Sequence, residues 1–214
     1  MKKELICFDL DNTLIDSDRI HVTAFNYSFR KNGLPKVDPK RLVMLFGMGV
    51  NKFVRMLFPD LTDAEVKRVV RDHDRKVVTD TCRYAKTFKG VKPALERLKG
   101  HYKLAVLSNI KLAEIKATLK IVGIPLSDFD VLIGSDGVKN PKPSPEAIKL
   151  AMRQSGIRKG YMVGDTIYDI QAGKAAGLRT VAVLTGHHSR YRLKKENPDY
   201  ILKSVAGLPE LLLD

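Results

Sequence analysis

The sequence predicts an α/β protein with a doubly wound parallel sheet and a helical block inserted after the first strand. Residues 6–8 form an apolar run that fits a buried strand, and from residue 87 onward short apolar strands alternate with helical patterns. Residues 16–85 show helical spacing and no convincing strand. At 214 residues, the chain is long enough for one core and a smaller second module.

The inserted block has recognisable helix starts. Asp16 and Ser17 are N-cap candidates for its first helix, and Thr62 with Glu65 has capping-box spacing before its longest helix, which runs toward residue 84. We therefore divide the chain into a helical domain and an α/β core, with the boundaries 16–85 for the former and 1–15 with 86–214 for the latter.

The remaining elements follow from alternating patterns. Strands are predicted at residues 102–107, 129–133, 161–163 and 180–184, with a last one at 200–202. Helices are predicted at 91–98, 111–122, 143–154, 169–176 and 208–213. Parallel sheets of this kind bind ligands beyond the carboxyl ends of their strands, so the residues there are the candidates for function.

Composition points to an ordinary globular protein, with 44% hydrophobic and 29% charged residues. No apolar run approaches the roughly 20 residues of a membrane span, and residues 1–4 lead straight into the first strand without room for a signal peptide. We expect a cytoplasmic location. Cys7 and Cys82 are too few for a disulfide framework or a metal cluster and are expected to be free thiols.

The formal charge of +14 allows two interpretations, nucleic-acid binding or attraction of a small anionic substrate. The 38 basic residues are spread along the chain, without a long basic arm. The densest run, 190–195, fits a solvated face of a surface helix. We expect a small anionic partner, no nucleic acid and no membrane, in a monomer or homodimer.

Asp9 and Asp11 stand where the first strand ends. At the two-residue period of a strand they point to the same side of the chain, so two like charges are held close together. They either cap a turn together with Asn12, or share a cation and take part in chemistry.

Other polar residues follow other strands. Ser108 and Asn109 come after residues 104–107, Asp165 comes after Gly164, and Lys142 lies among prolines just ahead of a helix. Each has a plain alternative, as a helix cap, a turn or a solvated lysine. Together, acids, a lysine and a hydroxyl at one sheet edge are what is needed to hold Mg²⁺ and a phosphoryl group.

Four motifs in this order resemble those of the haloacid dehalogenase superfamily, in its phosphatase branch. They are DLDNT at 9–13, the strand ending in Ser108, the lysine of NPKPSPEA at 140–147 and GDTIYD at 164–169. The resemblance implies the strand order 5-4-1-2-3, which places the aspartates where the order changes direction. It also implies that the helical block is a cap, as in phosphoglycolate phosphatases and β-phosphoglucomutases.

The resemblance assigns roles to the matching residues. Asp9 would attack phosphorus and form an aspartyl-phosphate, and Asp11 would act as general acid and then general base. Ser108, Asn109 and Lys142 would bind the phosphoryl oxygens, with the lysine opposing the charge of the transition state.

A divalent cation is implied by the same motifs. Asp165, the carboxylate of Asp9 and the backbone carbonyl of Asp11 would hold Mg²⁺, with Asp169 acting directly or through water. Dehalogenases generally lack an acid at the position of Asp11, so the resemblance favours phosphatases and phosphomutases.

The substrate stays open. A small metabolite such as phosphoglycolate, a sugar phosphate turned over by a mutase, a nucleotide and pyrophosphate all fit. His21 resembles a histidine at the cap hinge of mutase and phosphatase members, or it simply packs a helix. The other histidines show no metal spacing in the sequence.

Specificity is expected to come from the cap. The segment Gly47-Met48-Gly49 fits a loop lowered onto the substrate, flanked by Arg41, Lys52 and Arg55 as binders of a carboxylate or second phosphate; a plain turn between helices is the alternative.

Overall fold

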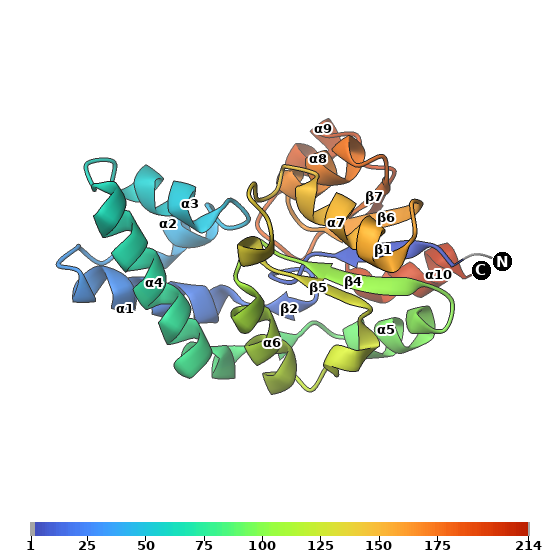
Figure 1. The fold of residues 1–214 in the computed structure, drawn as a ribbon, viewed down its shortest axis with the longest axis horizontal. Helices are drawn as coiled ribbons and strands as arrows, with labels where there is room; N and C mark the ends of the chain where they lie inside the picture. The colour runs from blue at the N-terminus through green and yellow to red at the C-terminus, as the bar shows by residue number, and fades with distance from the viewer. Residues whose placement is uncertain (1–2, 214) are drawn as a thin grey trace.

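The computed structural model describes residues 3–213, so Met1 and Lys2, part of the N-terminal stretch considered above, lie outside it. The chain forms a six-stranded parallel sheet with helices on both faces, and a separate body of helices at one end (Figure 1). The strand order is β5-β4-β1-β6-β7-β8. The strands are β1 (Leu5–Phe8), β4 (Lys103–Leu107), β5 (Val131–Ile133), β6 (Gly160–Gly164), β7 (Arg179–Val183) and β8 (Tyr200–Leu202).

This order confirms the predicted topology, because β1 lies at the centre and the chain proceeds outward first to one side and then to the other. The predicted last strand at 200–202 extends the sheet beyond β7. The helices of this part are α5 (Val91–Lys99), α6 (Leu112–Ile121), α7 (Glu146–Ser155), α8 (Ile167–Ala175), α9 (Arg190–Lys195) and α10 (Leu208–Leu212).

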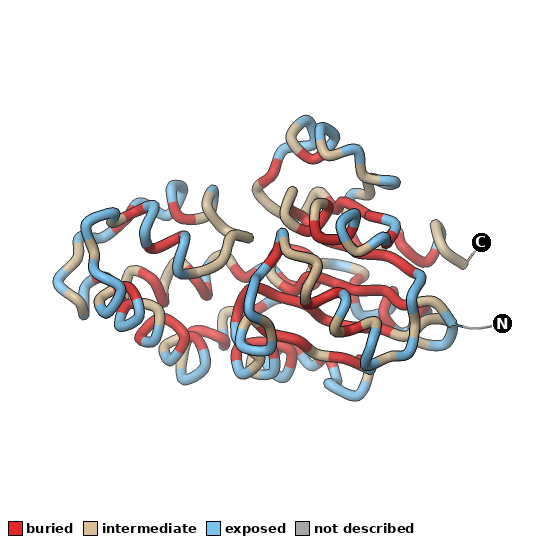
Figure 2. The backbone as a smooth tube through the Cα atoms, turned by 45° about the horizontal axis from the view of Figure 1, so that its top comes forward, coloured by how far each residue is buried: buried red, intermediate tan, exposed pale blue. Residues whose placement is uncertain are grey.

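The burial of β1 follows from the helices that cover both faces of the sheet. All four residues of β1 are fully buried, and their side chains alternate between two apolar clusters. Ile6 and Phe8 pack with α5 and α6, whereas Leu5 and Cys7 pack with α7 and α8. The sheet is accordingly among the most continuously buried parts of the backbone (Figure 2).

The helical body consists of α1 (Asp18–Lys31), α2 (Pro39–Val43), α3 (Val50–Leu57) and α4 (Asp63–Thr79). It has an apolar cluster of its own, built around Phe29, Leu42 and Phe53. The capping box predicted at the start of α4 is present, since the Thr62 side chain accepts from the Glu65 backbone N–H and the Glu65 carboxylate accepts from that of Thr62. Ser17 occupies the N-cap of α1 but makes no side-chain cap bond.

Two very short strands flank the inserted block, of which only Asp16 belongs to a strand, so the block is helical as predicted. β2 (Ile15–Asp16) pairs antiparallel with β3 (Lys86–Thr87), where the chain enters and leaves the helical body. Two residues per strand are too few to show the alternation by which strands are predicted. None of the helices within residues 3–213 has the length and apolar character needed to cross a membrane.

Candidate active site

The sheet order brings the predicted polar residues to one edge. β1 lies between β4 and β6, so the residues that follow these three neighbouring strands meet at their carboxyl ends. Asp9 follows β1, Ser108 follows β4 and Asp165 follows β6. These residues, with Asp11 and Lys142, line one cavity between the sheet and the helical body.

Lys142 is the central cation of this edge. Its Nζ donates to Asp9 Oδ1 at 2.7 Å, to Asp169 Oδ1 at 2.7 Å and to the Leu107 carbonyl oxygen at 3.1 Å. Burial disfavours the charged ammonium, but the carboxylates of Asp169 and Asp9 outweigh it and raise the pKa of Lys142. The lysine is therefore a fixed positive charge beside the Asp9 carboxylate.

Three carboxylates crowd around that single lysine. Oxygen atoms of Asp9, Asp165 and Asp169 all lie within 4.8 Å of one another, and all three residues are buried. Burial raises the pKa of Asp9 to about 7, with Asp169 adding to the effect and Lys142 opposing it. Burial also raises the pKa of Asp165 well above its usual range, as do Asp9 and Asp169. This set of oxygen ligands, with more negative charge than Lys142 balances, fits a divalent cation such as Mg²⁺.

Two of these aspartates are further held by hydroxyl groups that the sequence did not single out. Thr13 Oγ1 donates to Asp165 Oδ1 at 3.0 Å. Thr166, the N-cap of α8, donates through its backbone N–H (3.0 Å) and its hydroxyl (2.6 Å) to Asp169 Oδ2. A threonine after the acidic motif and a Thr-x-x-Asp spacing are the sequence features that could have indicated these contacts.

Asp11 has different partners from Asp9. Its Oδ1 lies 3.1 Å from His21 Nε2, and its Oδ2 accepts from the Ser108 hydroxyl at 3.3 Å. Burial favours the neutral acid, but the charge and hydrogen bond of His21 outweigh it and lower the pKa of Asp11. Burial would likewise lower the pKa of His21, but Asp11 raises it. The buried His21 and the half-buried Asp11 are thus hydrogen-bonded to each other, with one proton between them, at this edge of the sheet.

Asn109 lies at this edge with its side chain bonded to the backbone. Asn109 Oδ1 accepts from the Lys142 N–H at 2.9 Å, and its Nδ2 donates to the carbonyl oxygens of Gly47 (2.9 Å) and Lys142 (3.2 Å). This amide therefore ties the segment that carries Lys142 to a loop of the helical body. Its predicted contact with phosphate would have to come from another atom of the residue.

The opposite wall of the cavity belongs to the helical body and is mostly apolar, with His21 and His73 as its polar residues. Phe25, Phe46 and Phe53 line it together with Gly47 and Met48 of the predicted loop.

The cations predicted for this wall lie elsewhere. Arg41, Lys52 and Arg55 are exposed and are not among the residues that line the cavity; Arg55 instead pairs with Asp63. Their spacing around the loop indicated only proximity in sequence. Lys52 lines an adjoining cavity, which shares Met48, Asn109 and Lys142 with the first.

The structure also brings together histidines that the sequence left unconnected. His21 Nδ1 lies 3.1 Å from His73 Nε2, although the two residues belong to different helices of the helical body. No spacing in the sequence indicated this contact. Cys7 and Cys82 are free and buried, as predicted.

Comparison with known proteins supports the arrangement. A family model described as haloacid dehalogenase-like hydrolase matches residues 6–183. A phosphoglycolate phosphatase of Aquifex aeolicus is 34% identical over 214 residues, which cover 97% of this chain and 96% of that protein. The pyrophosphatase PpaX of Halalkalibacterium halodurans is 28% identical over 215 residues, covering 99% of this chain and 98% of that one.

A solved structure shares the whole fold. The crystal structure of a haloacid dehalogenase-like hydrolase from Bacteroides fragilis has a TM-score of 0.90 at 22% identity and covers 97% of this chain and 100% of its own. The likeness extends over sheet and helical body together. With the family model spanning most of the sequence, the chain belongs to the haloacid dehalogenase-like hydrolases.

Proposed function

We propose that this protein is a Mg²⁺-dependent phosphatase that hydrolyses a small phosphate monoester through an aspartyl-phosphate on Asp9. The observation that carries the proposal is the buried Asp9 carboxylate, 2.7 Å from Lys142 and beside Asp165 and Asp169, at the carboxyl edge of the sheet. The family and its phosphatase relatives support hydrolysis of phosphate esters.

In the first step, a carboxylate oxygen of Asp9 attacks phosphorus and the bond from phosphorus to the leaving oxygen breaks. Asp11 delivers a proton to that leaving oxygen. Because the pKa of Asp11 is lowered, this proton comes from His21, whose Nε2 lies 3.1 Å from Asp11 Oδ1 and passes the proton to the Asp11 carboxylate as the leaving oxygen takes it up. Lys142 and Ser108 bind the phosphoryl oxygens, and the lysine opposes the negative charge of the transition state.

In the second step, water attacks the acyl phosphate, Asp11 accepts a proton from that water, and phosphate leaves as the Asp9 carboxylate is regenerated. Mg²⁺, held by Asp9, Asp165, Asp169 and the backbone carbonyl of Asp11, would supply positive charge next to the phosphoryl group.

We propose residues 16–85 as the cap that selects the substrate, and the remainder as the catalytic core. The apolar cap wall supports a monoester with a compact organic group over pyrophosphate. No Lys or Arg of the described cap residues lines this cavity, and apart from His21 and His73 a second phosphoryl group would meet apolar side chains, phenyl rings among them.

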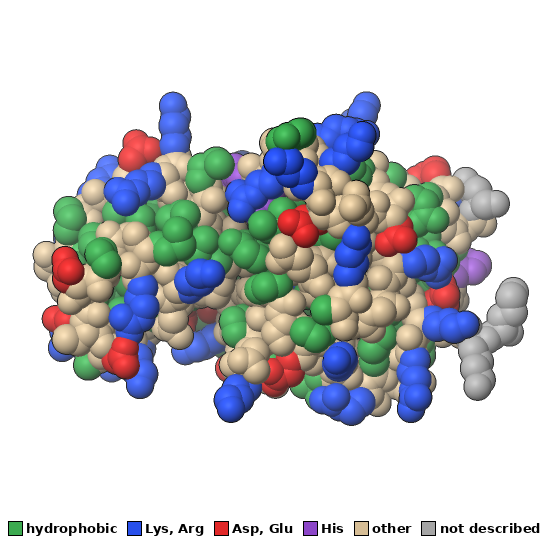
Figure 3. All heavy atoms as spheres, turned by 90° about the horizontal axis from the view of Figure 1, so that it is seen from above, with side chains coloured by type: hydrophobic (Ala, Val, Ile, Leu, Met, Phe, Trp, Pro, Cys, Tyr) green, Lys and Arg blue, Asp and Glu red, His purple; other side chains and the backbone are tan. Residues whose placement is uncertain are grey.

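The nucleic-acid alternative has less support. On the face shown in Figure 3, Lys and Arg side chains extend from one end of the molecule to the other and are mixed with Asp and Glu, without forming one basic stripe.

Phosphate release from a panel of phosphorylated metabolites tests the proposal. With Mg²⁺ we expect turnover of small monoesters, including phosphoglycolate, at a higher kcat/KM than that of pyrophosphate, and none for Asp9→Asn. Duplex binding with steep salt dependence and no phosphate release would favour the nucleic-acid alternative.

A further inference from the structure

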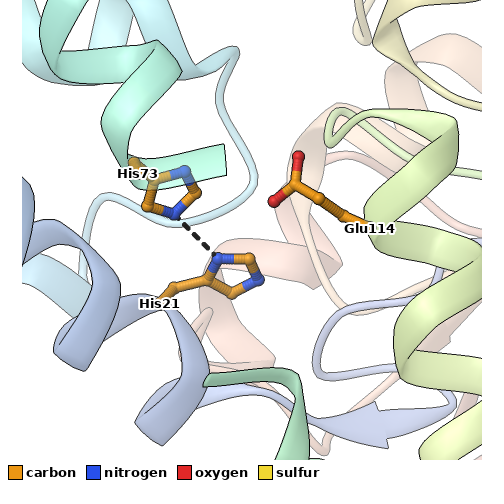
Figure 4. A group of neighbouring side chains, drawn as sticks. All are labelled: His21, His73 and Glu114. Carbon is orange, nitrogen blue, oxygen red and sulfur yellow. Dashed lines mark hydrogen bonds between the residues drawn. The ribbon is translucent and has the colours of Figure 1, made fainter. Parts of the chain in front are cut away.

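Three buried side chains meet where the cap contacts the core, apart from the crowded aspartates. His21 comes from α1, His73 from α4 and Glu114 from α6 (Figure 4). One potential ligand atom of each lies within 4.8 Å of the others. The proposed hydrolysis uses neither His73 nor Glu114.

The protons of the two imidazoles can be assigned from their outer partners. His21 Nε2 lies 3.1 Å from an Asp11 oxygen, and His73 Nδ1 lies 2.9 Å from an Asp74 oxygen. An ionised carboxylate only accepts hydrogen bonds, so each outer nitrogen carries a proton. The inner nitrogens, His21 Nδ1 and His73 Nε2, face each other at 3.1 Å. Either a proton on His21 Nδ1, which a charged His21 would donate to His73 Nε2, or a metal ion between the two nitrogens keeps their lone pairs from opposing each other.

Glu114 directs a further lone pair to the same place. Its side chain is turned toward the two rings in Figure 4, and the residue is 1% exposed. One carboxylate oxygen accepts from the Lys111 N–H at 3.1 Å, but Oε2 is buried without a hydrogen-bond partner. A carboxylate oxygen buried without a partner is costly, so this atom favours a ligand.

We propose that His21, His73 and Glu114 form a second metal site, selective for Zn²⁺, that joins the cap to the core. Two imidazole nitrogens and a carboxylate oxygen are a ligand set that Zn²⁺ accepts and Mg²⁺ does not prefer. With zinc–nitrogen distances of about 2.0–2.1 Å, the observed separation of the inner nitrogens corresponds to an angle of roughly 100° at the metal, close to tetrahedral. Asp11 and Asp74 would orient the two histidines, as carboxylates commonly do behind zinc ligands.

Such a site would act on the motion of the cap. The two histidines belong to the cap and Glu114 to the core, and an ion pair between Lys111 and Asp74, at 2.9 Å, crosses the same junction. Zn²⁺ would hold the cap against the core and slow any turnover that needs the cap to open. This consequence rests on the proposed function, whereas metal binding itself does not.

Titration with Co²⁺ at saturating Mg²⁺ tests the site directly, because Co²⁺ reports its coordination by visible absorption. We expect one Co²⁺ per chain, with the intense bands of a four-coordinate site, displaced by Zn²⁺. Glu114→Gln and His73→Gln should each weaken binding by more than about tenfold. Asp165→Asn, which alters only the aspartate site, and His101→Gln, at an exposed histidine, should leave it unchanged.

Two results would overturn the proposal. Binding that is lost in Asp165→Asn but kept in Glu114→Gln would place the metal among the aspartates. A wild-type protein that binds no Co²⁺ would mean that the imidazoles share only a proton. If His73→Gln fails to fold, the nearly isosteric Glu114→Gln decides.

Phosphate release tests separately whether Zn²⁺ holds the cap against the core. At fixed Mg²⁺, Zn²⁺ should slow phosphate release by the wild type, a zinc-selective chelator should restore it, and Glu114→Gln should be insensitive. Equal inhibition of the wild type and of Glu114→Gln by Zn²⁺ would show that Zn²⁺ does not act by holding the cap through this site. If no variant releases phosphate at all, the proposed function fails, while the Co²⁺ titration still decides the metal site.

Discussion

Asp9 and Asp11 leave β1 on the same side of the chain, but they meet different partners. Asp9 lies against Lys142 and close to Asp165 and Asp169, whereas Asp11 lies against His21 and Ser108. Burial raises the pKa of Asp9 to about 7, while the pKa of Asp11 is lowered because His21 outweighs its burial. Their sequence positions alone do not distinguish the two carboxylates, whereas their surroundings in the structure do.

This difference predicts where a phosphoryl group accumulates. An aryl phosphate with a good leaving group scarcely needs the acid, so Asp11→Asn should slow hydrolysis of the intermediate more than its formation. Mass spectrometry of quenched Asp11→Asn protein should then find one added phosphoryl group, on the peptide that contains Asp9. Asp9→Asn should carry none, and near-normal turnover by Asp9→Asn would mean that water attacks the substrate directly.

Crowding at the metal site predicts opposite effects on stability and activity. In the metal-free protein, Asp165→Asn removes a buried charge that Asp9 and Asp169 repel, so its thermal midpoint should rise by about 2–4 °C for each kcal/mol of relief. Mg²⁺-dependent phosphate release should collapse. Asp60→Asn, at an exposed position, is the control for both measurements. Unchanged Mg²⁺ dependence in Asp165→Asn would rule out this residue as a ligand.

At the scale of elements, the start of α8 joins the active site to a histidine outside it. The backbone N–H of Ile167, the first residue of α8, donates to His188 Nδ1 at 3.0 Å. Burial and the positive charge of Arg192 lower the pKa of His188 from 6.5 to about 4. The neutral ring is thus the form that accepts this helix-terminal hydrogen bond.

The lowered pKa of His188 predicts that the stability of the protein depends on pH. Between pH 6.5 and about 4, the unfolded chain binds more protons at His188 than the folded chain does, so the stability contributed by the neutral ring is lost as pH falls. The slope from this group is at most about 1.4 kcal/mol per pH unit. Urea unfolding of His188→Gln should show a shallower loss than the wild type over this range, and His101→Gln should match the wild type. Parallel curves for the wild type and His188→Gln would contradict the assignment.

Elements with strong local patterns were predictable from the sequence, and the weakly patterned ones were not. The Thr62–Glu65 box and the apolar run of β1 are recognisable within a few residues, and both are present as expected. β2 and β3 were missed, because a two-residue strand is stabilised by its partner across the junction and has no periodicity of its own.

At the scale of the whole molecule, the carboxyl edge of the sheet was predictable because parallel topology places strand ends together. The cap wall was not predictable in the same way. Which side of a helix faces the cavity depends on how two bodies pack, so the aromatic lining and the His21–His73 contact appear only in three dimensions.

Closure of the cap over the core predicts an effect at Gly47. Its φ is +93°, and a Cβ there would lie 2.6 Å from Thr166 Cγ2 in the core. Gly33 also has a positive φ, +72°, but a Cβ added to it would meet nothing within 4 Å, so it separates backbone strain from steric contact. Both alanine variants should lose about 1 kcal/mol of stability.

Only Gly47→Ala should displace the loop from the core. The kcat/KM of this variant should fall by roughly 100-fold, because a small misplacement of groups that position the substrate can cost that much. Steady-state kinetics together with thermal unfolding make the comparison. Equal kinetic losses in Gly33→Ala and Gly47→Ala would show that close packing of this loop is not required.

The antiparallel pairing of β2 with β3 has an evolutionary consequence. Because Ile15 is paired with Thr87 and Asp16 with Lys86, the two crossings into the helical body lie side by side. A segment whose ends adjoin can be lengthened, shortened or exchanged by recombination without moving the strands that carry the aspartates. The same chemistry can then be inherited unchanged by descendants that differ in what they recognise. Selection for a new substrate would act first on the seventy or so residues between these two strands, as length is tolerated at such junctions.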